Sequence, residues 1–264
     1  MTARACVSML GLVLWTCAGH AATLSLEQMT WTEVRDAIAA GKTTIIVPIG
    51  GTEQNGPHMV LGKHNVRARV LSERIAELLG NALVAPTIAY VPEGAIEPPI
   101  GHMRFPGTIS IPAPAFVSML EGAGKSFRAA GFRDIVFLGD HGGYQRDERT
   151  AADRLNREWR TTSTRAHAIE EYYRVVETSF RDVLKSRGFR DDEIGVHAGL
   201  ADTSLTLAVD ARLVRTDRLP VATGPAATTG VQGDARRATA ESGMLGVDAI
   251  VTTTVAAIRR AQRR

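Results

Sequence analysis

Patterns of buried β-strands alternate with patterns of amphipathic helices along most of this chain. The first strand is expected over residues 43–49, TTIIVPI, a run of mostly β-branched residues suited to a strand that is buried on both faces. Further strands are expected at 82–91, 134–138 and 166–173, and helices at 66–79 with Asn65 as the cap, 113–130, 147–159, 175–185 and 236–262. This alternation predicts a single α/β domain with a mostly parallel sheet covered by helices on both faces.

The length of the chain fits a single domain, and its charge gives no indication of a nucleic-acid partner. A chain of 264 residues can bury one sizeable core, and no long linker rich in Pro or Ser divides it. The formal net charge is +3, and the one basic cluster in the sequence is at the C-terminus: Arg259, Arg260, Arg263 and Arg264. Such a cluster is more typical of a solvated helix end than of a nucleic-acid arm, so we expect no nucleic-acid partner.

The first 21 residues have the pattern of a cleavable secretory signal. An arginine precedes an apolar stretch over residues 5–17, and small residues at Gly19 and Ala21 stand before a cleavage point ahead of Ala22. A buried N-terminal helix is the alternative. We expect residues 1–21 to be removed and residues 22–264 to form a soluble exported protein in the periplasm. The apolar run is too short to span a bilayer, so no stable membrane insertion is expected after cleavage.

Both cysteines, Cys6 and Cys17, lie in this N-terminal segment. Lipid attachment at Cys17 is a weaker alternative to cleavage, because Trp15 and Thr16 are poor residues for the positions before a lipid-modified cysteine. The mature chain therefore has no thiol for a disulfide, a nucleophile or a metal. Any metal must be held by His, Asp and Glu.

Two loops that follow expected strands carry side chains able to bind a metal. The first, GGTEQNGPHMVLGKHN at 50–65, contains Glu53 and His64, and the second, GDHGGYQ at 139–145, contains His141. In parallel sheets, ligands collect beyond the carboxyl ends of the strands, so these residues are expected to converge. Each residue alone is better explained as a cap, a turn residue or a surface charge. Together, two imidazoles and one carboxylate predict a divalent metal site with open positions for water and substrate.

Five segments, taken in order, resemble the signature blocks of the creatininase, or creatinine amidohydrolase, family. They are GGTEQNGPHMVLGKHN, HMRFPGTISI at 102–111, FLGDHGGYQ at 137–145, HAGLADTSLTLA at 197–208 and GVQGDARRATAESG at 230–243. These blocks cover nearly the whole expected mature chain, which makes the match more specific than any single motif. The resemblance implies a metal-dependent hydrolase of cyclic or linear amide C–N bonds, with an α/β fold and assembly into homo-oligomers such as hexamers.

The chain departs from the family pattern at three metal positions. The family's first block usually has His where this chain has Asn55 and Asp where it has His64, and creatininase has Glu at the position of Gly143. A carboxylate can bridge two metals with its two oxygens, whereas a neutral imidazole has a single free nitrogen. The resemblance and these departures predict one divalent metal per chain, Zn²⁺ with Mn²⁺ or Fe²⁺ as alternatives, held by Glu53, His64 and His141.

Such a hydrolase also needs a group that protonates the leaving nitrogen. His197 matches the histidine of the family's HAG block and is the first candidate, and Asp202 is the second, either as a base or as a further metal ligand. A core histidine with a satisfied hydrogen bond is an equal alternative for His197. His58 is interpreted in one of two ways: it either orients Glu53 or contacts the substrate, or it is a structural turn residue. His102 is interpreted as a wall of the pocket.

Two functions of different class remain open from the sequence. The preferred hypothesis is an enzyme that hydrolyses a small-molecule amide with a metal-activated water. The alternative is a catalytically inactive protein of the same fold that serves as a binding or assembly protein in the periplasm. A nucleotide-binding domain is not favoured, because GGTEQNG has neither the GxGxxG nor the GxxxxGK spacing. The sequence does not identify the substrate.

Overall fold

A four-stranded parallel sheet with the strand order β2-β1-β3-β4 forms the centre of the molecule. The structure is a computed structural model that describes residues 23–223 and 225–263, so the expected signal segment lies outside the described residues and stays a prediction. The strands are β1 (Thr44–Ile49), β2 (Ala82–Val84), β3 (Asp134–Gly139) and β4 (Arg165–Ala168). The predicted α/β domain with a parallel sheet is confirmed.

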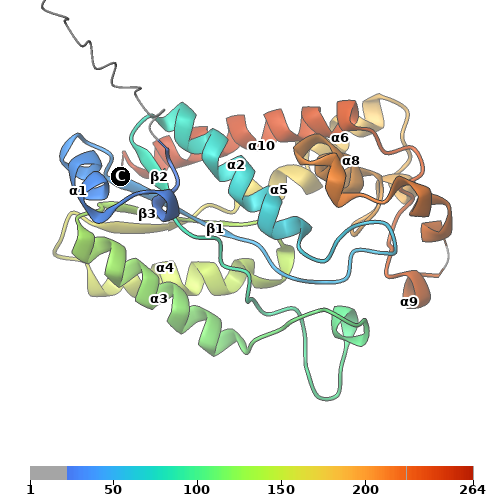
Figure 1. Cartoon of the computed structure of the whole chain (residues 1–264), viewed down its shortest axis with the longest axis horizontal. Coiled ribbons are helices and arrows are strands. Elements are labelled where there is room, and N and C mark those ends of the chain that lie inside the picture. The colour runs from blue at the N-terminus through green and yellow to red at the C-terminus, as the bar shows by residue number, and fades with distance from the viewer. Residues whose placement is uncertain (1–22, 224, 264) are drawn as a thin grey trace, which may run out of the picture.

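Helices cover both faces of the sheet, with α2 and α10 on one side and α3 and α4 on the other (Figure 1). The α-helices are α1 (Trp31–Ala39), α2 (Lys63–Leu79), α3 (Ala113–Ala130), α4 (Gln145–Glu158), α5 (Glu171–Glu177), α6 (Ser179–Ser186), α7 (Asp191–Ile194), α8 (Leu200–Val209), α9 (Ala226–Thr229) and α10 (Ala240–Ala261). Short 3₁₀ turns are η1 (Leu26–Gln28), η2 (Gly101–Arg104), η3 (Gly142–Tyr144), η4 (Ala211–Leu213) and η5 (Thr216–Thr223).

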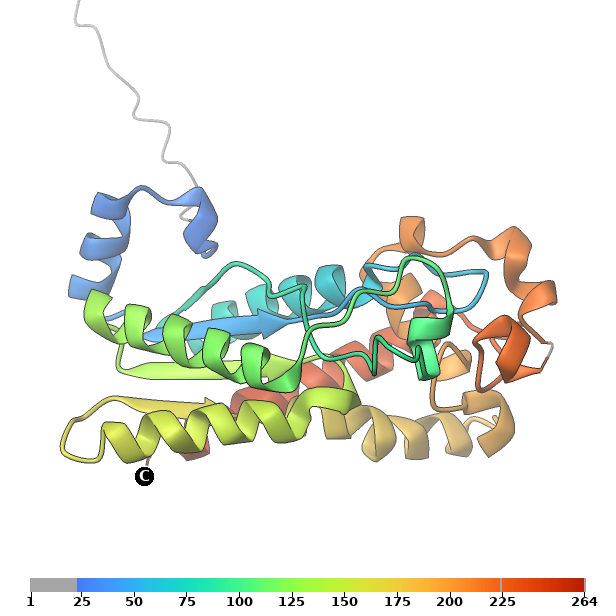
Figure 2. The same ribbon diagram turned by 90° about the horizontal axis from the view of Figure 1, so that it is seen from below.

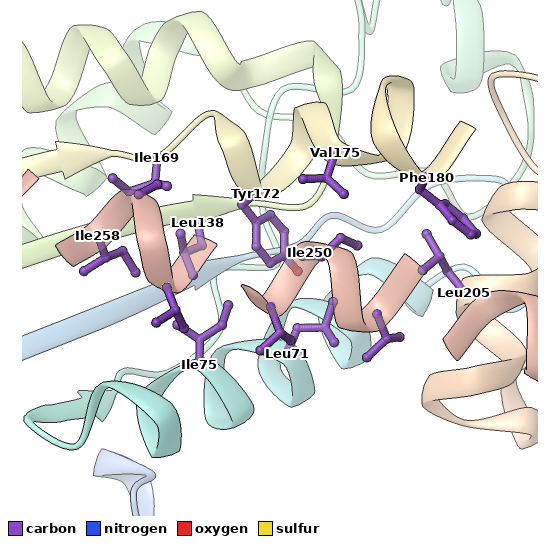
Figure 3. Packing of buried hydrophobic residues seen from close by; sticks show 14 of the residues in the cluster. Leu71, Ile75, Leu138, Ile169, Tyr172, Val175, Phe180, Leu205, Ile250 and Ile258 are labelled. Atoms are coloured by element: carbon purple, nitrogen blue, oxygen red, sulfur yellow. The ribbon is translucent and has the colours of Figure 1, made fainter. Parts of the chain in front are cut away.

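The two-residue period of the strands divides the core into two halves. In β1, Ile46 points to the half that contains α2, α5, α8 and α10, whereas Ile45 and Val47 point to the half that contains α3 and α4. Figure 3 shows the first half, in which Leu71 of α2, Leu138 of β3 and Ile250 of α10 belong to one buried cluster. Because both faces are buried, β1 reads as a continuous apolar run in the sequence.

Helix α10 is long and apolar enough to cross a membrane by length and composition, and it is the one such helix among the described residues. In the structure its apolar face packs in the same core half, where Val247, Ile250 and Ile258 are fully or almost fully buried. Its composition is therefore explained by its place in the core.

Several predicted boundaries are wrong, each for a local reason. Helix α2 begins at Lys63 after Gly62, and the Asn65 side chain does not cap it but accepts a hydrogen bond of 2.9 Å from the Gly51 amide. The strand expected at 82–91 ends at Val84, because Pro86 two residues later has no N–H for the ladder. Helix α4 begins earlier than expected, at Gln145, and α10 begins later, at Ala240.

The segment after β3 differs most from the prediction. The strand expected at 166–173 is β4, which ends at Ala168, and the expected helix at 175–185 is two helices separated at Thr178. Helix α1 was not predicted, although Thr30 and Glu33 form a capping box at its start. Helix α8 was also missed, because most of its residues are buried and it has no regular polar face.

The strands direct their carboxyl ends toward one end of the molecule. In Figure 2 the arrowhead of β1 points to that end, where the segment between α6 and α9 also lies. The loop that follows β1 and the turn that follows β3 therefore lie side by side, since β1 and β3 pair in register up to Ile49 and Gly139. This end of the sheet is where ligands of parallel α/β proteins bind.

Candidate metal centre

Four histidines surround the carboxylate of Glu53, which is fully buried. His64 Nε2 lies 2.8 Å from Oε1 and His197 Nδ1 lies 3.8 Å from the same oxygen. On the other oxygen, Oε2, His102 Nε2 is at 3.4 Å and His141 Nε2 at 3.5 Å. The structure thus brings Glu53, His64 and His141 together, as predicted, and adds two further imidazoles.

The loop after β1 holds Glu53 through its own backbone. The Glu53 amide donates to the Leu61 carbonyl at 3.2 Å, and the Asn55 amide group donates to the carbonyls of Glu53 and Val60 at 2.8 and 3.2 Å. Asn55, which replaces a family histidine, therefore fastens the loop instead of pointing at a metal. This arrangement gives Glu53 a fixed position without any contact from Asn55 to its carboxylate.

His64 is oriented by Asp140 so that its second nitrogen faces Glu53. Asp140 Oδ2 lies 2.6 Å from Nδ1, and this short contact to a carboxylate places a hydrogen on Nδ1. The Nε2 atom then lies 2.8 Å from Glu53 Oε1. An imidazole that donates one N–H to a carboxylate and turns the other nitrogen inward is the usual arrangement of a histidine metal ligand.

Asp140 is held from three sides. Arg67 Nε donates to both of its oxygens, at 3.1 and 2.8 Å, and the Tyr172 hydroxyl donates to Oδ1 at 3.0 Å. Its own amide donates to the Ile49 carbonyl at the end of β1. The sequence prediction missed Asp140, although it directly precedes His141 in the second loop.

Replacing Asp140 with Asn is expected to weaken metal binding by about 10- to 100-fold, because the amide cannot satisfy His64 and Arg67 together. Competition with a chelator measures the affinity. The matched control is Asp134→Asn, which removes the partner of His167 (2.8 Å) at the other end of β3. Equal metal affinity in Asp140→Asn and Asp134→Asn would contradict the role given to Asp140.

Glu93 is a second buried carboxylate beside this group and was not predicted. It is 6% exposed, and its Oε2 lies 3.7 Å from His141 Nε2. Among residues 23–223 and 225–263, neither Glu93 oxygen has a hydrogen-bond partner, and Glu53 Oε2 also lacks one. Three buried carboxylate oxygens without a partner need a cation or a proton between them.

The charges of these groups follow from their surroundings. Burial and the neighbouring Glu53 carboxylate raise the pKa of Glu93 to about 9. Burial opposes ionisation of Glu53, but the contact with His64 and the other imidazoles close to the carboxylate outweigh it and hold the pKa of Glu53 below its usual range. Burial lowers the pKa of both His141 and His197 to about 4, so both imidazoles are neutral at pH 7. Neutral imidazole is the form that binds a metal.

Gln54 determines which nitrogen of His102 and of His197 carries hydrogen. Its amide is fixed, because Oε1 accepts from the Gly56 amide at 3.0 Å and Nε2 donates to the Gly230 carbonyl at 3.0 Å. The same Nε2 donates to His102 Nδ1 at 2.7 Å, so the hydrogen of His102 is on Nε2, facing Glu53. His197 Nε2 lies 3.0 Å from the Gln54 carbonyl and donates to it, which leaves a lone pair on Nδ1.

His102 lines the cavity, as interpreted from the sequence, and the structure also places its Nε2 hydrogen toward the Glu53 carboxylate. His58 takes the structural role, since its Nε2 lies 3.0 Å from the Thr203 hydroxyl in the interior. Asp202, the second catalytic candidate, forms ion pairs with Lys63 and Arg67 and accepts from the Ala198 amide at 3.0 Å. Its carboxylate is engaged by two cations rather than presented as a free base.

A cavity of about 240 Å³ opens onto this group. Its lining includes the four histidines His64, His102, His141 and His197, and also Tyr173, Val176, Glu177, Arg181 and Val196. The volume is close to that of a small organic molecule, so the cavity could receive a small amide or one end of a longer one.

Among the described residues, two sets of three ligand atoms lie within 4.8 Å of one another, and both contain Glu53. The first set is Glu53, Glu93 and His141, the second is Glu53, His102 and His197, and His64 is in neither. In the second set His102 presents a hydrogen on Nε2, held in place by buried Gln54. In the first set the exposed Gly143 amide donates to His141 Nδ1 at 3.1 Å, so His141 also carries its hydrogen on Nε2 until a metal displaces it.

Comparison with known proteins finds matches over most of this chain. The family model described as Creatininase, creatinine amidohydrolase, matches residues 27–258. A creatinine amidohydrolase of Pseudomonas putida is 29% identical over 210 residues, which are 75% of this chain and 77% of that protein. A mycofactocin precursor peptide peptidase of Mycobacterium ulcerans is 31% identical over 185 residues, which are 67% of this chain and 62% of that protein.

Solved creatininase structures share the fold. One described as Zn-Zn type has a TM-score of 0.75 at 27% identity and covers 91% of this chain and 98% of its own. Another, described as creatininase Mn, has a TM-score of 0.75 at 26% identity and covers 91% of this chain and 99% of its own. Metal of either kind is thus recorded in proteins with this architecture.

Proposed function

Because this chain belongs to the creatininase family, we propose that it is a metal-dependent hydrolase that cleaves the C–N bond of a small amide. Its relatives include a creatinine amidohydrolase and a peptide peptidase, so both cyclic and linear amides are represented among them. Hydrolysis of an amide bond is the chemistry that these relatives have in common.

The proposal is carried by one observation: the buried, unpartnered Oε2 of Glu53 faces His141 Nε2 at 3.5 Å, with His64 Nε2 on its other oxygen. A carboxylate in this position needs a cation, and the neutral imidazoles supply the nitrogen ligands. We propose that Glu53, His64 and His141 hold one divalent metal, with Zn²⁺ preferred and Mn²⁺ or Fe²⁺ as alternatives. When bound, the metal would polarise the amide carbonyl and promote ionisation of a water.

Side chains of this protein would carry out the proton transfers of the hydrolysis. His197 Nδ1 has a free lone pair 3.8 Å from Glu53, so it can take a proton from the attacking water and pass it to the leaving nitrogen. His102 Nε2 can donate a hydrogen bond to an oxygen that gains negative charge in the same space. Gln54 keeps these two roles distinct, since it contacts both rings.

The experiment is to purify the protein without added metal, measure the metal content, and then test a panel of cyclic and linear amides. We expect close to one equivalent of tightly bound divalent metal per chain. Glu53→Gln should lose most of the metal and all hydrolysis, because an amide carries no charge for the cation. The control Glu73→Gln changes a half-buried carboxylate paired with Arg69 on α2 and should keep both the metal and the hydrolysis.

The results separate the two classes of function. Wild-type protein that holds metal but hydrolyses none of the amides would favour the alternative, an inactive binding or assembly protein of the same fold. Wild-type protein that holds no metal would contradict the proposal.

A further inference from the structure

We infer that Glu93 is a further ligand of the metal, supplied by the extended segment after β2. This inference rests on the proposed function, because it adds a ligand to the same site. The resemblance to the family does not assign Glu93, which lies outside every segment that carries it.

Glu93 has no hydrogen-bond partner in the described part of the chain, and its charged form would need a cation. Its side chain is 6% exposed, and neither oxygen accepts a hydrogen bond within the described residues. Oε2 lies 3.7 Å from His141 Nε2, and together with a Glu53 oxygen these ligand atoms lie within 4.8 Å of one another. A buried carboxylate without partners costs several kcal/mol by order of magnitude when it is charged, so a cation in the gap would remove this cost.

Two backbone segments lie close to the Glu93 side chain. The Glu93 amide donates to the Ser110 hydroxyl at 3.0 Å, which fixes the start of the side chain. Gly51, in the loop that carries Glu53, has φ +147, and a Cβ atom there would lie 2.3 Å from Glu93 Oε1. The loop after β1 therefore approaches the Glu93 oxygen as closely as a residue without a side chain allows.

Charge gives a second reason. A divalent cation held by Glu53 and neutral imidazoles alone would leave one positive charge in a buried site. The loop after β1, residues 50–65, supplies a single carboxylate, that of Glu53. Glu93 adds a second negative charge from a different segment, so that two carboxylates and the neutral His141 imidazole face a 2+ ion.

The experiment measures the affinity for Zn²⁺ and for Mn²⁺ by chelator competition, and the thermal unfolding of metal-free protein, in wild type, Glu93→Gln and Glu93→Asp. We expect Glu93→Gln to weaken binding of both ions by at least about 10-fold. The metal-free variant should be as stable as wild type or more stable, because an uncompensated buried acid has been removed. Glu93→Asp keeps the charge and should retain part of the affinity.

The matched control is Glu148→Gln. Glu148 on α4 is 1% exposed and also has an oxygen without a partner, but it is not part of the two ligand sets. It should bind both ions as tightly as wild type. Wild-type affinity in Glu93→Gln, with wild type itself binding metal, would overturn the role of Glu93 and leave the proposed function standing; absence of metal binding in wild type would overturn both.

Discussion

Replacing His64 with Ala should weaken metal binding by more than about 100-fold and abolish hydrolysis, because it removes a proposed ligand and not only the partner of one. The ring lies between Asp140, 2.6 Å from Nδ1, and Glu53, 2.8 Å from Nε2. Alanine would leave both carboxylates without this link. Metal content after dialysis, melting temperature and amide hydrolysis should be measured on the same preparations.

A second substitution separates a ligand from a structural histidine. His64→Asp restores the residue usual in the family, and its oxygen can take part of the coordination, so this variant should retain more metal than His64→Ala. The control is His167→Ala, a histidine on β4 that pairs only with Asp134 in the described hydrogen bonds and should leave metal content unchanged. Full metal occupancy in His64→Ala would reject the assignment of His64 and the three-ligand site with it.

The sheet was predictable because burial on both faces leaves a direct mark in the sequence. Residues 43–49 and 134–138 are apolar runs, and β1 and β3 match them within one residue. Helix α3 was predicted at its observed bounds, since Pro112 precedes it and Gly131 ends it in the left-handed conformation. Helix α8 was not predictable from periodicity, because it is enclosed by other helices and has no regular solvent face to reveal a period of 3.6.

The candidate site was predictable only where its residues follow a strand directly. Glu53 and His141 stand next to β1 and β3, so topology alone brings them together. Glu93 lies nine positions beyond the end of β2, in a segment with no helix or strand. No local sequence pattern predicts that this segment brings Glu93 close to His141. Asp140 was overlooked for another reason: a partner of a ligand is identified by its hydrogen bonds, and these need the folded structure.

Arg67→Met should lower the free energy of unfolding by about 3–5 kcal/mol, because it removes one partner from a buried ionic network. Arg67 is 5% exposed and pairs with Asp140 at 2.8 Å and Asp202 at 2.8 Å, while Lys63 pairs with Asp202 from the other side. Methionine fills a similar volume but leaves the carboxylates with too little positive charge. Chemical denaturation of metal-free protein measures the effect without a contribution from bound metal.

The control for this loss lies on the same helix. Arg69 on α2 pairs with Glu73 at 3.0 Å on the surface, and Arg69→Met should cost only about 0.3–0.5 kcal/mol. If both substitutions cost the same small amount, the buried network does not stabilise the fold.

The buried ionic network should make the free energy of unfolding depend on pH in a predictable direction. Burial alone would raise the pKa of Asp202, but the charges of Lys63 and Arg67 outweigh it and hold the pKa well below its usual range. A carboxyl group whose pKa is lower in the folded state contributes stability above its unfolded pKa, about 3.9, and loses it as the pH falls further. The difference in stability between wild type and Arg67→Met should therefore be largest near pH 7 and narrow below about pH 4. A difference that stays constant from pH 7 to pH 3 would mean that Arg67 stabilises the protein by packing and not by its charge.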